Sequence, residues 1–68
     1  MFTVEYRVRE NKGRQYSKWH KASEHELPSE ARQAFAQHIA EFWTFDLRLI
    51  DQHNGKTLAN YKYSQLER

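Results

Sequence analysis

The stretch that decides the fold is residues 27–42, which read LPSEARQAFAQHIAEF. Its larger apolar side chains recur at spacings of four, four, four and three residues, which is the repeat of one helix face. Pro28 fits the first helical turn, where a backbone N–H has no intrahelical partner. The pattern predicts an amphipathic helix over residues 28–42. Its apolar stripe consists of Leu27, Ala31, Phe35, Ile39 and Phe42.

Before this helix, residues 2–9 alternate between apolar and polar side chains, a pattern typical of a half-buried strand. Residues 11–14 predict a turn, because Gly13 tolerates positive φ. Residues 15–22 then return as a second strand. The alternation in this second strand is irregular, since Tyr16 and Trp19 fall on opposite parities. A bulge or an early strand end would reconcile the two aromatic residues.

After the helix, residues 45–52 and 56–63 predict a second pair of strands, joined at the Asn-Gly turn signal of residues 54–55. A two-residue loop would place apolar side chains opposite polar ones. A three-residue loop over residues 53–55, with Gly55 as a bulge, pairs apolar with apolar and is the favoured register. The expected pairs are Leu49 with Ala59, Leu47 with Tyr61, and Phe45 with Tyr63.

Two hairpins flanking one helix predict a single domain over residues 1–68 with the order β-β-α-β-β. The helix stripe covers one face of a four-stranded antiparallel sheet, giving an α+β two-layer sandwich. The other sheet face stays open to solvent. That face is expected to carry Thr3, Glu5, Arg7, Arg9, Asp46, Arg48, Ile50, Leu58, Asn60 and Lys62.

Charge is distributed unevenly along the chain. Residues 1–21 hold six cations and two carboxylates, a net charge of +4, whereas residues 22–68 hold five cations and seven carboxylates, a net charge of −2. Aromatic side chains are interleaved with the N-terminal cations, which favours a partner with phosphates to contact and bases to stack. The alternative is a solvated hairpin whose charges prevent edge-to-edge pairing. The candidate contacts to nucleic acid or an acidic protein surface are Arg7, Arg9, Lys12, Arg14, Tyr16, Lys18, Trp19 and Lys21.

A second candidate surface would bind a larger protein or ribonucleoprotein complex. Its residues are Trp43, Arg48, Ile50 and Leu58. Trp43 falls beside the helix stripe and would serve either as an exposed anchor or as the cap of a small core. The third alternative is a homo-oligomeric structural module, since a homodimer would relieve the small core of a 68-residue chain.

Catalytic signatures are missing from the sequence. There is no cysteine and no glycine-rich phosphate loop, and only two glycines are present. The histidines at 20, 25, 38 and 53 match no compact metal-ligand spacing. We therefore expect no enzyme activity, no metal and no cofactor. The chain has no apolar run long enough to cross a membrane and no leader pattern, so the expected location is cytoplasmic without a membrane partner.

One resemblance lies in the segments 30–35, 45–50 and 54–59, which read EARQAF, FDLRLI and NGKTLA. They resemble segments of compact phage- or prophage-encoded accessory proteins, among them anti-CRISPR and other anti-defence inhibitors that pack one helix on an antiparallel sheet. The resemblance covers about half the chain and brings no site residues with it. It implies a small non-enzymatic protein that blocks or recruits a larger assembly, often by competing with nucleic acid.

Overall fold

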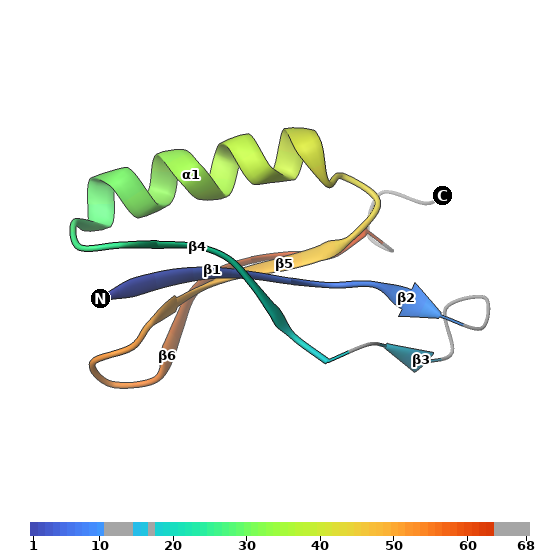
Figure 1. The fold of residues 1–68 in the computed structure, drawn as a ribbon, viewed down its shortest axis with the longest axis horizontal. Helices are drawn as coiled ribbons and strands as arrows, with labels where there is room; N and C mark the ends of the chain where they lie inside the picture. The colour runs from blue at the N-terminus through green and yellow to red at the C-terminus, as the bar shows by residue number, and fades with distance from the viewer. Residues whose placement is uncertain (11–14, 17, 64–68) are drawn as a thin grey trace.

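A computed structural model describes the backbone of residues 1–10, 15–16 and 18–63, and the side chains of residues 1–8 and 18–63. The elements are β1 (Phe2–Arg7), β2 (Arg9–Glu10), β3 (Gln15–Tyr16), β4 (His20–His25), α1 (Pro28–Glu41), β5 (Asp46–Asp51) and β6 (Lys56–Tyr61). Strands β4, β1, β5 and β6 form one antiparallel sheet in that order, and α1 lies across one of its faces (Figure 1). The predicted α+β sandwich is confirmed.

The core lies between α1 and the sheet. Val4, Leu47 and Ala31 are fully buried there, because alternate strand residues point to the helix and the helix stripe points back. Leu27 is 55% exposed, so its predicted place in the stripe is wrong. It is the N-cap residue with an extended backbone, φ −102° and ψ 138°, and its side chain therefore departs from the helical repeat.

Aromatic rings close the core at the C-terminal end of α1. The rings of Tyr6, Phe42 and Phe45 stack on one another with centroids 5.6–5.8 Å apart, and His38 stacks on Phe42 at 5.7 Å. The helix ends without a glycine. Instead the N–H of Phe42 donates to the carbonyl of His38 at 2.7 Å, and the N–H of Phe45 donates to the carbonyl of Phe42 at 2.8 Å. These two bonds turn the chain directly into β5.

The first hairpin is divided into two parts, which the sequence did not predict. Its base is the β1–β4 pair of the main sheet, and its outer part is the separate β2–β3 ribbon. The second strand also runs on to His25, three residues beyond its predicted end. The irregularity expected between Tyr16 and Trp19 corresponds to the break between β3 and β4. A bulge also lies further along, where Val4 pairs with Ser23 and Glu5 with Lys21, leaving Ala22 as the extra residue.

The second hairpin has the predicted register. Leu49 lies opposite Ala59 and Leu47 opposite Tyr61, whereas Phe45 falls outside the paired segment. The predicted loop is wrong in detail. Asp51 pairs with Lys56, so the loop has four residues, 52–55, and the extra residue that restores the register is Leu58 rather than a residue of the turn. The apolar pairing is therefore preserved by a bulge inside β6.

The glycine of this loop has a backbone requirement that a substitution can test. Gly55 has φ 71°, in the left-handed region, and a Cβ built on it would meet nothing within 4 Å. Gly55→Ala should therefore lower the free energy of unfolding by about 1–2 kcal/mol through backbone strain alone. Urea denaturation would measure this loss. His53→Ala in the same exposed loop is the control and should change it by less than about 0.5 kcal/mol; equal effects of the two substitutions would contradict the strain argument.

Candidate nucleic-acid interface

On the sheet face opposite α1, cations of one strand lie against carboxylates of the next. The β1–β5 register places Glu5 opposite Arg48 and Arg7 opposite Asp46. Arg48 Nε donates to Glu5 Oε1 at 2.7 Å, and Arg7 Nε donates to Asp46 Oδ2 at 3.3 Å. The two arginines are therefore held in place by partners that also neutralise them.

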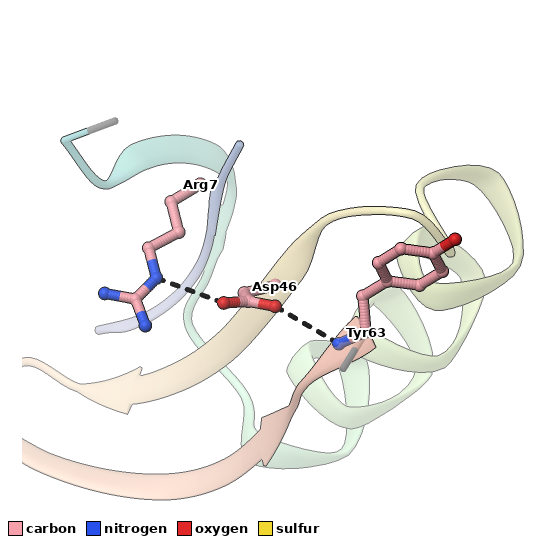
Figure 2. Close-up of polar contacts among 3 residues, drawn as sticks. All are labelled: Arg7, Asp46 and Tyr63. Atoms are coloured by element: carbon pink, nitrogen blue, oxygen red, sulfur yellow. Dashed lines mark hydrogen bonds and ion pairs between the residues drawn. The ribbon is translucent and has the colours of Figure 1, made fainter. Parts of the chain in front are cut away.

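Asp46 is the most buried member of these pairs, with 1% of its surface exposed. Its second carboxylate oxygen, Oδ1, accepts the backbone N–H of Tyr63 at 3.1 Å. Figure 2 shows the carboxylate lying between the Arg7 guanidinium and this N–H. A buried carboxylate requires such compensation, because burial without partners costs several kcal/mol. Asp46 thus ties the ends of β1 and β6 to the start of β5.

Trp19 lies outside the strands, between β3 and β4, and covers this pair of arginines. Its ring is 4.6 Å from the guanidinium carbon of Arg7 and 4.1 Å from that of Arg48, both within cation–π range. A hollow of about 170 Å³ opens beside the ring. Besides Trp19, Arg7 and Arg48, its wall includes the polar residues Thr57, Asn60 and Lys62.

The β2–β3 ribbon lies outside the main sheet, beyond the region that α1 covers (Figure 1). Arg9 pairs with Tyr16 and Glu10 with Gln15, and the ribbon extends beyond the end of the main sheet (Figure 1). Residues 9–18, which span the ribbon, hold four cations and one carboxylate, a net charge of +3. The rest of the chain holds seven cations and eight carboxylates, a net charge of −1. The ribbon segment therefore carries the chain's excess of positive charge.

The predicted nucleic-acid contacts are distributed between the sheet and the ribbon. Lys18 and Lys21 are exposed, and Lys21 Nζ lies 3.5 Å from Glu24 on the same strand. Arg7 and Trp19 belong to the cluster on the open face. Lys12, Arg14 and the side chains of Arg9 and Tyr16 lie outside the described residues.

Three of the four predicted protein-contact residues, Arg48, Ile50 and Leu58, lie on the paired strands β5 and β6, and the fourth, Trp43, lies in the turn between α1 and β5. Trp43 is 54% exposed and stands edge-on to Tyr63, with the ring centroids 5.8 Å apart. Leu58 is 37% exposed. Ile50 is only 8% exposed, because it lies on central strand β5 opposite buried Thr3, so it offers little contact area. Arg48 belongs to the Trp19 cluster instead.

Sequence reasoning missed a polar cluster between β4 and α1. His25 Nε2 and His38 Nε2 lie 2.9 and 3.1 Å from the hydroxyl oxygen of Ser23. His38 Nδ1 lies 3.2 Å from Glu41 Oε1, three residues further along α1. Among those residues, no three potential metal ligands gather. A separation of 15 residues between Ser23 and His38 left no sequence signal for this contact.

Comparisons of the chain with protein-family models, with curated proteins and with solved structures each give no match. Within the described part of the chain, no helix has the length and apolar character needed to cross a membrane.

Proposed function

We propose that this chain is a non-catalytic nucleic-acid-binding protein whose contact element is the β2–β3 ribbon with its connecting residues, 9–18. The observation that carries the proposal is the location of the charge. Arg7 and Arg48 on the open sheet face and Lys21 on β4 each lie within 3.5 Å of a carboxylate, whereas residues 9–18 have a net charge of +3. Affinity for a polyanion therefore depends on the ribbon.

The shape of the ribbon fits such a partner. Two-stranded antiparallel ribbons are narrow enough to enter a nucleic-acid groove, and their cations meet phosphates along the backbone. The ribbon reaches past the helix-covered sheet, so a polyanion can approach it from beyond the end of α1 (Figure 1). Trp19 follows directly on Lys18 and places an aromatic ring at the ribbon's base.

Salt dependence of binding tests the proposal. If the four cations of residues 9–18 each contact a phosphate, counterion release predicts that affinity falls about 50- to 150-fold between 50 and 200 mM salt. Fluorescence anisotropy with labelled 12-nucleotide single strands and duplexes would measure the slope. An affinity independent of salt, or no binding to either probe at 50 mM salt, would refute the proposal.

A second candidate function is inhibition of a larger protein or ribonucleoprotein assembly, the action that the resemblance to phage accessory proteins implies. The half-exposed indole of Trp43 favours it, since exposed tryptophans are frequent anchors of protein interfaces. A pull-down from bacterial lysate with nuclease treatment separates the two functions. A stoichiometric protein partner that resists nuclease and is lost with Trp43→Ala would support inhibition; loss of all bound material on nuclease treatment would support nucleic-acid binding.

A further inference from the structure

The hollow beside Trp19 has the size and the lining that suit a small planar group. Its volume of about 170 Å³ lies below the 300–1,000 Å³ of pockets that enclose a whole drug-sized ligand. It can therefore hold one group of a larger ligand while the remainder lies outside. Its lining includes the indole of Trp19 and the guanidiniums of Arg7 and Arg48 that lie against it, and flat heterocycles stack on both kinds of group.

The wall is held in position before any ligand arrives. Arg7 and Arg48 lie against the Trp19 ring, and each guanidinium is fixed by a carboxylate, Asp46 for Arg7 and Glu5 for Arg48. A ring supported by two anchored guanidiniums does not need to be ordered on binding. Such preorganisation lowers the entropic cost of forming a complex.

The lining residues contributed by β6 and the residue after it offer hydrogen bonds and one cation. Asn60 and Lys62 are exposed residues at the β6 edge of the sheet. An amide side chain both donates and accepts hydrogen bonds, which matches the edge of a nucleobase, and an ammonium group matches a phosphate. Among the described residues, Lys62 makes no ion pair. The site thus combines an aromatic wall, an amide and a cation around one hollow.

The local charge sets the ligand class. Arg7 and Arg48 are each paired with a carboxylate, Asp46 and Glu5 respectively. With Lys62 added, these five groups have a net charge of about +1. A single phosphate beside each planar group would balance that charge. A triphosphate carries more negative charge than these cations can balance, and it would be repelled by the two carboxylates. A repeating unit of one base and one phosphate is a nucleotide within a strand.

We propose that the hollow bounded by Trp19, Asn60 and Lys62 receives one unstacked base of a single-stranded nucleic acid, with the adjoining phosphate on Lys62. This inference rests on the proposed function. Trp19 comes one residue after Lys18. A nucleic-acid strand bound along the ribbon cations would therefore continue directly to the hollow. A base inside a duplex is paired and stacked and cannot enter. The chain therefore prefers single strands to duplexes.

The test uses three fluorescein-labelled probes with equal numbers of phosphates per strand: a 12-nucleotide single strand, the same strand with abasic central positions, and the strand annealed to its complement. At 50 mM salt we expect the abasic strand to bind about 5- to 150-fold more weakly than the intact strand, the loss that one stacked base implies. In a Trp43→Phe background, Trp19 is the remaining tryptophan. Its fluorescence should be quenched by the single strand and unchanged by the duplex.

Variants assign the effect to the hollow. Trp19→Ala should lower single-strand affinity about 5- to 150-fold and leave duplex affinity and the salt slope unchanged. Asn60→Ala should lower single-strand affinity about 3- to 10-fold, and Lys62→Gln should reduce the salt slope by about 0.7. Asn60 and Lys62 are exposed edge positions, so their variants carry the test even if Trp19→Ala fails to fold. Gln37→Ala, which removes an exposed amide from α1, is the matched control for Asn60→Ala.

The outcomes separate this inference from the proposed function. If intact and abasic strands bind equally and the hollow variants bind like the parent, the hollow is not a base site while the ribbon function stands. Equal losses for single strand and duplex in Trp19→Ala would make Trp19 a support for the ribbon and would also overturn the inference. If no probe binds, the proposed function itself fails.

Discussion

Replacing Asp46 with alanine should lower the free energy of unfolding by about 3 kcal/mol, because it leaves the part-buried Arg7 guanidinium and the Tyr63 N–H without this carboxylate. A domain of 68 residues has a total stability of about 3–10 kcal/mol. The variant should therefore be partly or fully unfolded at 37 °C. Urea denaturation followed by circular dichroism would measure the loss.

The control for this prediction lies at the other end of the same strand. Asp51 accepts the N–H of His53 at 3.0 Å in an exposed turn, so Asp51→Ala should cost only about 0.5–1 kcal/mol. Asp46→Asn keeps an acceptor for the Tyr63 N–H and loses only the charge opposite Arg7. Its cost should fall between the two alanine variants. If Asp46→Ala and Asp51→Ala cost the same, the buried carboxylate does not tie β1, β5 and β6 together.

Removing two ribbon cations should weaken nucleic-acid binding more than any other charge change of equal size. At 50 mM salt, each lost phosphate contact costs about 10-fold in affinity, so Arg9→Gln with Arg14→Gln should cost about 100-fold. The slope of log affinity against log salt should become shallower by about 1.4 for single strands and 1.8 for duplexes. Fluorescence anisotropy over 50–200 mM salt would give both quantities.

The matched control removes two cations elsewhere. Arg32→Gln with Lys56→Gln lowers the net charge from +2 to 0, as the ribbon pair does, but changes exposed residues on α1 and β6. This control should keep the parent's salt slope. Equal losses in the two double variants would mean that affinity follows overall net charge, and the ribbon would have no special role.

The layers of the fold were predictable because each element has one apolar face. The spacing of Ala31, Phe35 and Ile39 allows one helix face to meet the sheet, and the alternation around Leu47 and Leu49 determines which side of β5 faces that helix. The second hairpin register followed from the same requirement, since a slip of one residue would expose Leu47. The exact site of the bulge did not follow, because several positions restore the same pairing.

The cluster on the open face could not be predicted, because it depends on which hairpin strands become neighbours. The hairpin patterns predict that β1 pairs with β4 and β5 with β6, but they do not predict that β1 also pairs with β5. That pairing places Asp46 against Arg7, which is 39 residues away in the sequence. The position of Trp19 likewise depends on the break between β3 and β4, where the strand pattern only indicated an irregularity.

An amide NMR titration of the intact chain with the 12-nucleotide single strand and its duplex tests the central claim most directly. Binding through the ribbon predicts chemical-shift changes that begin in residues 7–21, including the indole N–H of Trp19, and that spare the outward face of α1. Shift changes centred on α1 or around Trp43, with the ribbon amides unmoved at saturating nucleic acid, would contradict it.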